Sequence, residues 1–339
     1  MSIKKVILYG CGSYFKKNKD LLPTDIQVVA YCYSERISYL QSAKDFLLPN
    51  IPIICKDDIP NYIFDEIVIC SGPASAPEIY LILKNALKID KHRISLFDHS
   101  KSDWSLYNCD LDSEHNMIVC IQEYKFYLNG DSDFRIISEI FINNAYDISV
   151  PNKNSVLVDI GMNVGMASLY FSGVRNISKI YGFEPFCDTY NYALNNFNAN
   201  SKSLSEKIIP INLALSDFDG EIDVCSFLDN LGGRSIIPEF GNKQEKRFSI
   251  VCKKSSEVVN RIIEENCESD IYIKIDTEGS EIQIIRDLIN NDIIKKIKAI
   301  ILEYHNNADK VKELFDIANW DYYRSGRKYS GIIFAYNHR

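Results

Sequence analysis

The sequence lacks three features, and each absence argues against a class of protein. No apolar run approaches the roughly 20 residues that cross a bilayer, so membrane insertion is not expected. The 10 cysteines form no C-x-x-C pair and follow no signal peptide, which favours reduced thiols in a cytoplasmic protein over disulfides or a zinc site. The formal net charge of −8 argues against nucleic acid as a partner, because a polyanion binds to a basic face.

The pattern of apolar runs divides the 339 residues into about two domains. In residues 1–100, short apolar runs alternate with a helical pattern over residues 78–88, which predicts a small N-terminal Rossmann-like α/β domain. Residues 101–150 are interpreted as a linker and a lead-in. Residues 151–339 are predicted to form a second α/β domain, and no repeat or low-complexity run interrupts it.

The N-terminal domain begins with a strand and a glycine turn, Gly10-x-Gly12. Phe15 stands where a dinucleotide site has its third glycine, and a bulky side chain there hinders close packing of helix on strand. The sequence leaves several interpretations open: a structural or oligomerising domain, a domain that binds a nucleotide or nucleotide sugar, and a nicotinamide-dependent oxidoreductase, which Phe15 disfavours. The oligomerising interpretation would make the protein a homo-oligomer.

The strongest signal is a strand, 156–160, that runs into Asp159-x-Gly161-x-Asn163-x-Gly165 and then a helical pattern. Strand, glycine turn and helix form the opening unit of a nucleotide-binding sheet, in which ligands lie at the carboxyl ends of the strands. A carboxylate at this strand end repels a diphosphate but suits a cationic ligand such as S-adenosylmethionine. Asp159, Gly161, Asn163 and Gly165 are therefore candidate cofactor ligands. The alternative is a tight turn that binds nothing.

Two later strands also end in acids. The strand 178–183 ends in Glu184, about where a carboxylate holds ribose hydroxyls in such sheets, although a solvated strand-end acid is the simpler interpretation. A third strand is predicted over 208–217. Its end, Ser216 and Asp217, can reach the adenine amino group or can cap the turn into Gly220.

Candidate catalytic residues follow two further predicted strands, 271–276 and 298–305. Asp276, Glu303 and His305 are expected at the carboxyl edge of the sheet, close to a transferable methyl group. A base there removes the proton of an attacking hydroxyl. His305 has the ordinary pKa suited to that task, and Asp276 is the other candidate.

These residues also have simpler interpretations. His305 can bond the backbone, Asp276 can cap the next helix, and Glu278 and Glu281 are typical helix-start acids. Asp276, Glu303 and Asn306 offer hard oxygen ligands, but no spacing requires a metal, and none is predicted.

Five blocks in this order resemble the FkbM-type S-adenosylmethionine-dependent methyltransferases. They are 159–165, 183–185, 212–217 followed by Gly220, 274–281 and 301–305. The resemblance covers about residue 115 to the C-terminus, and Met162 departs from it by replacing a small residue. It implies a class I methyltransferase sheet of seven strands whose last hairpin is antiparallel.

The resemblance also implies a reaction. It suggests O-methylation of a hydroxyl of a sugar, sugar nucleotide or glycan-linked metabolite in surface polysaccharide biosynthesis. N-methylation of an amino sugar or of a small metabolite is the alternative.

Other segments are candidates for shaping the acceptor site. The loop 230–235 reads as a lid in which Arg234 can pair with an anionic acceptor, and Tyr146 can help to shape an acceptor pocket. Arg327 and Lys328 lie in the turn of the predicted final hairpin and read as solvated charges.

Overall fold

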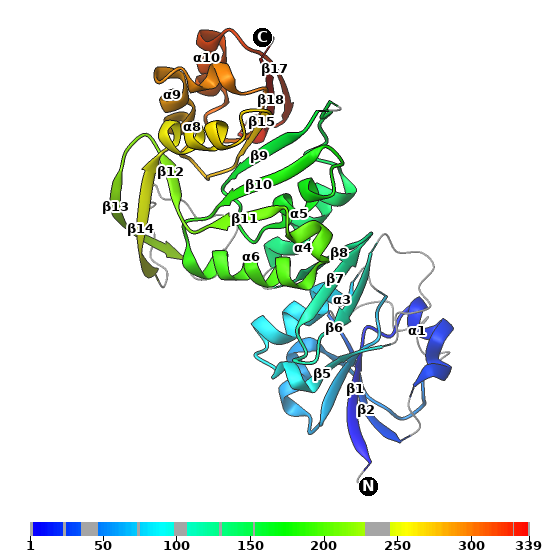
Figure 1. Cartoon of the computed structure of the whole chain (residues 1–339). Helices are drawn as coiled ribbons and strands as arrows, with labels where there is room; N and C mark the ends of the chain where they lie inside the picture. The colour runs from blue at the N-terminus through cyan, green and yellow to red at the C-terminus, as the bar shows by residue number, and fades with distance from the viewer. Residues whose placement is uncertain are drawn as a thin grey trace. The chain divides into compact units, whose positions relative to one another are not determined.

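The computed structural model of the chain describes residues 3–22, 25–34, 47–72, 75–97, 107–128, 131–151, 153–227, 245–327 and 329–337. The chain divides into two compact units, Met1–Phe134 and Arg135–Arg339 (Figure 1). The division falls inside the predicted linker. In the part of the chain that the structure describes, no helix has the length and apolarity needed to cross a membrane.

The N-terminal unit contains a parallel five-stranded sheet in the order β3-β2-β1-β4-β5. Its elements are β1 Lys4–Tyr9, α1 Ser13–Asn18, β2 Ile26–Tyr33, β3 Ile53–Cys55, β4 Glu66–Ile69, α3 Ala76–Leu81 and β5 Ile94–Leu96, with short 3-10 helices at Lys19–Leu21, Lys56–Asn61 and Lys91–Arg93. A π-helical turn, Ile82–Ala86, extends α3, so the helix predicted over 78–88 is confirmed. The strand order confirms the predicted Rossmann-like architecture.

A second, antiparallel sheet completes this unit, in the order β6-β7-β8. Its strands are β6 Asn108–Leu111, β7 Met117–Ile121 and β8 Tyr124–Tyr127. Residues alternate between buried and less buried along β7 and β8, as expected for a sheet with one covered face. Helix α4, Asp131–Ile137, follows and leads through a π-helical turn, Ser138–Ile142, into the C-terminal unit.

The C-terminal unit is built on a seven-stranded sheet in the order β11-β10-β9-β15-β16-β18-β17. Its strands are β9 Ser155–Ile160, β10 Ile177–Phe183, β11 Ile208–Ile211, β15 Asp270–Ile275, β16 Ala299–His305, β17 Asp321–Gly326 and β18 Ser330–Tyr336. The first five run parallel, and β18 is antiparallel to both β16 and β17. The predicted sheet with a final antiparallel hairpin is confirmed.

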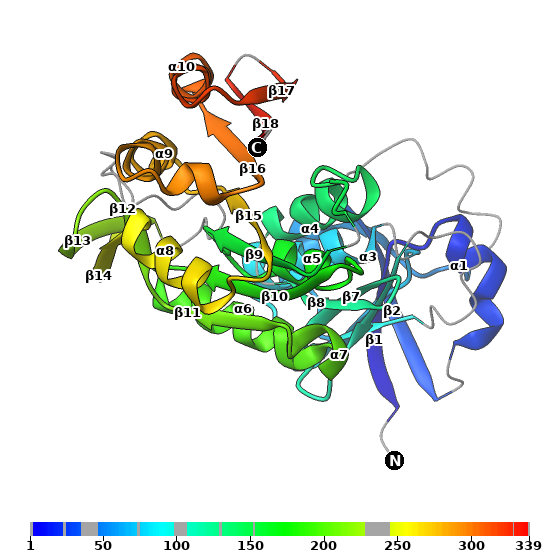
Figure 2. The ribbon, with the colours of Figure 1, turned by 45° about the horizontal axis from the view of Figure 1, so that its top comes forward.

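Helices cover both faces of this sheet (Figure 2). They are α5 Met166–Ser172, α6 Cys187–Ala199, α7 Lys202–Ser205, α8 Ser255–Glu265, α9 Glu281–Asn290 and α10 Ala308–Ala318, with a 3-10 turn at Ile293–Lys296. Because both faces are covered, β9 is buried along its whole length, and it reads as a continuous apolar run.

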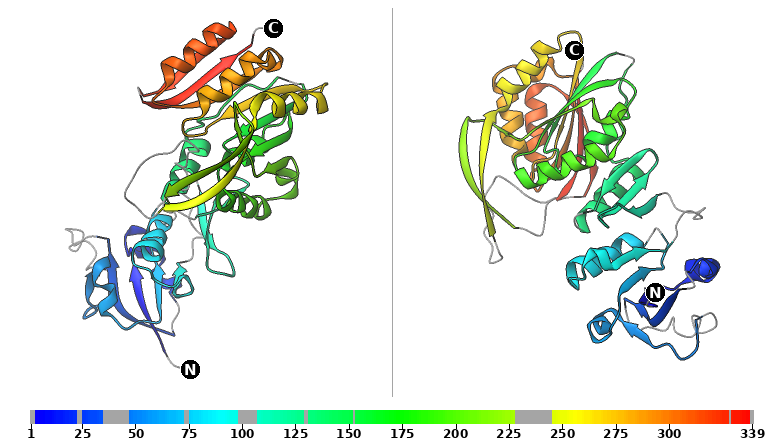
Figure 3. Two further views of the ribbon diagram at one scale, coloured as in Figure 1. Left: turned by 90° about the vertical axis from the view of Figure 1, so that its left-hand side faces the viewer. Right: turned by 60° about the horizontal axis from the view of Figure 1, so that its bottom comes forward.

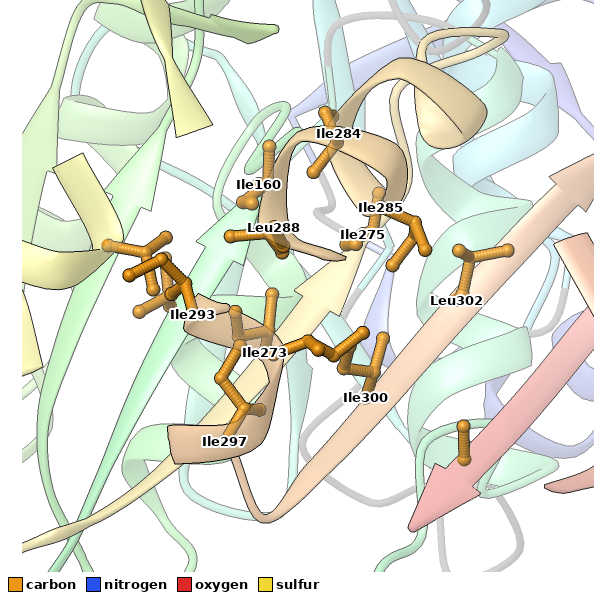
Figure 4. Packing of buried hydrophobic residues seen from close by; sticks show 14 of the residues in the cluster. Ile160, Ile273, Ile275, Ile284, Ile285, Leu288, Ile293, Ile297, Ile300 and Leu302 are labelled. Atoms are coloured by element: carbon orange, nitrogen blue, oxygen red, sulfur yellow. The ribbon is translucent and has the colours of Figure 1, made fainter. Parts of the chain in front are cut away.

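The main core lies between the sheet and helices α8, α9 and α10. Figure 4 shows Ile273, Ile275 and Ile300 from the strands facing Ile284 and Leu288 of α9. Side chains alternate along a strand, so Val156, Val158 and Ile160 of β9 join this core. Asp159 therefore points to the opposite face, where α5 lies.

The predicted third strand, 208–217, is wrong as a single element. The structure divides it into β11, which pairs with β10, and β12 Ala214–Ser216, which pairs with β14. The physical reason lies at Asn212, whose amide donates to the carbonyls of Glu184 and Pro185 at 2.7 and 3.0 Å and turns the chain away. Strands β13 Gly220–Phe227 and β14 Glu245–Lys254 run side by side as a curved ribbon (Figure 3).

Two residues of the β9 turn show how tightly this region packs. Gly161 has φ 81°, and a Cβ there would lie 1.7 Å from the carbonyl oxygen of Asp276. Met162 is buried, and its sulfur fills the space that Gly182 leaves, since a Cβ on Gly182 would lie 2.3 Å from it. The unusual methionine is thus accommodated by packing.

Candidate active site

The carboxyl ends of β9, β10, β15 and β16 meet along one edge of the sheet because these strands are parallel neighbours. Two hollows open there. The Glu184 hollow is lined by Gly161, Phe183, Glu184, Phe186, Leu213 and Thr277, among others. The Tyr146 hollow, about 270 Å³, is lined by Arg135, Glu139, Tyr146, Lys274, Glu303 and Ile332, among others. Asn163, Asp276 and Glu278 line both hollows.

Glu184 is buried and organises the turn after β9. Its Oε2 accepts the amide hydrogen of Asn163 at 3.0 Å, and its Oε1 accepts that of Phe186 at 2.9 Å. Asn163 adopts the left-handed conformation, φ 53°, which asparagine tolerates better than most residues. The Oδ1 of Asn163 is buried and has no hydrogen-bond partner among the described residues. A buried acceptor of this kind points to a ligand that donates to it.

Asp159 has partners inside the protein and lines neither hollow. Its side chain is fully buried. Ser168 of α5 donates to Oδ2 at 2.6 Å, and Lys274 Nζ lies 3.1 Å from Oδ1. Lys274 also donates to the carbonyl oxygen of Gly161 at 2.8 Å. The pairing of Asp159 with Lys274 fixes the glycine turn, and the direct contact of Asp159 with a ligand stays a prediction.

Burial and charge act in opposite directions on this pair. Burial raises the pKa of Asp159, and Lys274 and Ser168 offset only part of that effect. For Lys274, burial lowers the pKa, but the nearby carboxylates of Asp159 and Asp276 outweigh it, and the pKa is raised. Lys274 therefore stays charged, and it neutralises the carboxylates beneath the site.

His305 lies among carboxylates from three elements. Its Nδ1 is 3.2 Å from Glu281 Oε1, and its Nε2 is 3.3 Å from Glu278 Oε2 and 3.9 Å from Glu303 Oε1. Burial lowers its pKa, but the carboxylates of Glu281, Glu278 and Asp276 outweigh burial and raise the pKa to about 9. The ordinary pKa expected from the sequence is therefore wrong for His305, which carries a proton near neutral pH.

Glu303, and not His305, has a pKa close to neutral pH. Its burial and the charge of Asp276 raise the pKa to about 7, although His305 and Lys274 oppose the shift. The hydroxyl of Tyr146 donates to its Oε2 at 3.3 Å. A carboxylate with a pKa near 7 at the wall of a hollow is suited to accept a proton at neutral pH.

One group of side chains has the arrangement of metal ligands. Ligand atoms of Asp276, Glu278 and His305 all lie within 4.8 Å of one another. A metal ion would have to displace the proton of His305, since only neutral imidazole binds a metal. The expectation of no metal stays a prediction.

Glu281 is a buried acid in the first turn of α9. It begins α9, as predicted for a helix-start acid, and it accepts the amide hydrogen of Gly279 at 2.9 Å. Its other oxygen accepts from the Asn307 amide at 2.9 Å. It therefore holds both the turn after β15 and the His305 ring.

The remaining predicted residues divide as follows. Gly161 and Glu184 line the first hollow, and Tyr146 lines the second. Gly165, Ser216 and Asp217 line neither. A Cβ on Gly165 would lie 2.5 Å from the Phe197 ring, which explains that glycine by helix packing. The loop 230–235 with Arg234, and also Lys328, lie outside the described residues.

Sequence reasoning missed Lys274 and Arg135 as site residues. Lys274 carried a usable signal, because a lysine inside a strand buried on both faces needs a partner charge. Arg135 carried none, since an arginine in the last turn of a helix is ordinary.

The parallel sheet with its final antiparallel hairpin, and the acids at four strand ends, define a class I methyltransferase fold. A family model described as the methyltransferase FkbM domain matches residues 159–323. This region of the chain is therefore an FkbM-type, S-adenosylmethionine-dependent methyltransferase domain.

Individual relatives are distant. Methyltransferase sdnD from Sordaria araneosa is 24% identical over 192 residues, which cover 50% of this chain and 73% of that protein. Methyltransferase 1 from Beauveria bassiana is 24% identical over 183 residues, covering 47% and 72%. The crystal structure of methyltransferase FkbM from Methylobacillus flagellatus aligns with 99% of this chain and 90% of that one, at 10% identity and a TM-score of 0.36.

Proposed function

We propose that this enzyme transfers the methyl group of S-adenosylmethionine to a hydroxyl of a sugar, a sugar nucleotide or a glycan-linked metabolite. The observation that carries the proposal is that the Glu184 hollow and the Tyr146 hollow meet at Asn163, Asp276 and Glu278. A donor in the first hollow and an acceptor in the second would bring their reacting atoms together at these residues. Such alignment accounts for most of what an enzyme supplies to methyl transfer.

The residues of the Glu184 hollow suit the donor. Glu184 offers carboxylate oxygens to ribose hydroxyls, and Asn163 Oδ1 is a buried acceptor without a partner among the described residues. The enclosed volume of the hollow is about 50 Å³, well below the roughly 300 Å³ of a closed ligand pocket. The nucleoside would therefore lie in its open mouth.

The charge of the two hollows also suits a cationic donor. Their walls carry five carboxylates against two cations. The carboxylates belong to Glu139, Glu184, Asp276, Glu278 and Glu303, and the cations to Arg135 and Lys274. Opposite charge attracts a sulfonium and an ammonium group over several ångströms. This supports S-adenosylmethionine over an anionic dinucleotide.

Glu303 is the proposed base. The bound donor supplies a methyl group on a sulfonium, which is a good leaving group. The acceptor oxygen would form a bond to that methyl carbon as the carbon–sulfur bond breaks and leaves neutral S-adenosylhomocysteine, while the acceptor proton would pass to the Glu303 carboxylate. Tyr146 holds Glu303 by a hydrogen bond, and protonated His305, held by Glu281, balances the charge of Asp276, Glu278 and Glu303.

The Tyr146 hollow supports a small polar acceptor. Its volume of about 270 Å³ is close to the lower end of ligand pockets, which fits a monosaccharide unit better than an extended chain. Tyr146 offers an aromatic wall, and Arg135 and Glu139 offer polar groups at an exposed rim. Aromatic and polar walls of this kind are what a hydroxylated ring binds.

The test has two steps. Calorimetric titration with S-adenosylhomocysteine, with NAD as the comparison, should show binding of the first alone. Mass spectrometry of reactions with a panel of sugars, sugar nucleotides and amino sugars should then show a gain of one methyl group on oxygen. Binding of NAD alone would overturn the donor assignment, and methylation confined to amino groups would overturn the acceptor assignment.

A further inference from the structure

The N-terminal unit contains a cleft of about 680 Å³ that the methyltransferase site does not use. Its walls come from the carboxyl ends of β1, β2 and β4 and the segments that follow them, including Gly12, Tyr33 and Gly72. The strand order β3-β2-β1-β4-β5 means that the chain crosses from one side of β1 to the other after β3. Ligands of open parallel sheets bind outside the carboxyl ends of the strands at such a crossover. The volume is typical of a ligand pocket.

At one end of the cleft, a ligand can approach the backbone closely. Gly10 makes the turn after β1 with φ 78°, and a Cβ added to Gly12 would meet no atom within 4 Å. The backbone of Gly12 therefore faces open space, as it does where a ligand contacts main chain. Lys16 lines the same cleft, and its backbone amide donates to the Gly12 carbonyl at 3.0 Å. A glycine turn beside a lysine suits a phosphate.

The rest of the cleft suits a nucleoside. The partly exposed rings of Tyr14 and Tyr33 line it, and aromatic rings stack on bases. The Tyr33 ring is fixed, since its hydroxyl donates to the Cys11 carbonyl at 2.9 Å. Glu78 and several serines add acceptors and donors of the kind that hold ribose hydroxyls.

Phe15 departs from the dinucleotide fingerprint, although it does not itself line the cleft. Its ring is buried against Phe97, with centroids 5.8 Å apart, where a dinucleotide fingerprint has its third glycine. We infer that the N-terminal unit binds a nucleoside phosphate, a single nucleotide that is free or that carries a sugar, and not a dinucleotide. This inference does not depend on the identity of the acceptor.

The test is a titration of the full chain with UDP, GDP and ADP, and with UDP-glucose, in saturating S-adenosylhomocysteine. The saturating compound occupies the methyltransferase site, so binding that persists belongs elsewhere. At least one nucleotide should bind, while inorganic phosphate and NAD should not. Competition between the nucleotide and S-adenosylhomocysteine would overturn the inference. A tighter complex with UDP-glucose than with UDP would identify a sugar-carrying ligand.

Two variants locate the site. Gly12→Leu places a side chain in open space within the cleft and should abolish nucleotide binding while S-adenosylhomocysteine still binds. Lys16→Gln should weaken binding about tenfold, as expected for the loss of one charged phosphate contact. Lys17→Gln is the matched control, because Lys17 is an exposed lysine of the same helix that does not line the cleft.

The outcomes separate this inference from the proposed function. A chain that binds S-adenosylhomocysteine but none of the nucleotides would overturn the inference and leave the methyltransferase proposal intact. Nucleotide binding that survives Gly12→Leu, or that Lys17→Gln weakens as much as Lys16→Gln, would also overturn it.

Discussion

Replacing Lys274 by methionine should lower the free energy of unfolding of the C-terminal unit by about 3–5 kcal/mol. The Nζ of Lys274 lies 3.1 Å from Asp159 Oδ1, and the two side chains are 3% and 0% exposed. Without Lys274, a fully buried carboxylate keeps Ser168 as a hydrogen-bond donor but has lost its counter-charge. The cost should shrink at acidic pH, because a protonated Asp159 needs no counter-charge.

A surface pair with the same geometry provides the control. Lys153 Nζ also lies 3.1 Å from its partner, Asp270 Oδ1, but the Lys153 side chain is 56% exposed. Lys153→Met should cost at most about 1 kcal/mol, because water already solvates and screens the Lys153 charge. The double variant Asp159→Asn with Lys274→Met should cost less than the sum of the two single changes.

Urea unfolding is the assay, and the transition of the C-terminal unit is the one that S-adenosylhomocysteine shifts to higher urea. The reasoning is refuted if Lys274→Met and Lys153→Met lower the stability of that unit by similar amounts. It is also refuted if the two changes at the buried pair are simply additive, because the pair would then carry no coupling.

Three further predictions concern the site. Wild-type kcat/KM should rise with pH through about 7 as Glu303 loses its proton. Glu303→Gln should lower kcat by about 10² to 10⁴ without changing the affinity for S-adenosylhomocysteine. A pH profile of kcat/KM that the substitution leaves unchanged would exclude Glu303 as the base. The pKa of His305 is raised from 6.5 to about 9 on folding, so its contribution to stability is full below about pH 6.5 and lost as pH rises through about 9. The urea midpoint of His305→Gln should not show this loss of stability between pH 6.5 and 9. A parallel pH dependence of the midpoint in both proteins would contradict the prediction. Gly161→Ala should abolish S-adenosylhomocysteine binding, because its Cβ would lie 1.7 Å from the Asp276 carbonyl oxygen; wild-type affinity by calorimetry would show that the two strand ends can separate.

The elements that the sequence predicted well are those whose signal is local. Buried strands read as short apolar runs, and the residue that follows such a run lies at the edge of the sheet. By this rule Gly161, Glu184, Asp276 and Glu303 were expected at the sheet edge. They line the hollows there, and their roles stay predictions. The same reasoning failed at Ser216 and Asp217, because an apolar run does not show that Asn212 bonds the chain after β10 and sends it into another sheet.

The sequence by itself determined the order of strands and turns and the acids at the strand ends. Both are local features, because they depend only on an apolar run and on the residues next to it in the chain. Only the tertiary structure decided what each acid does. A pKa depends on burial and on charges from distant elements, so the proximity of His305 to Glu278 and Glu281 makes it a cation, while burial near Asp276 gives Glu303 a pKa of about 7. For the same reason Asp159, which the sequence placed at the ligand, is held beneath the site by Lys274 from a neighbouring strand.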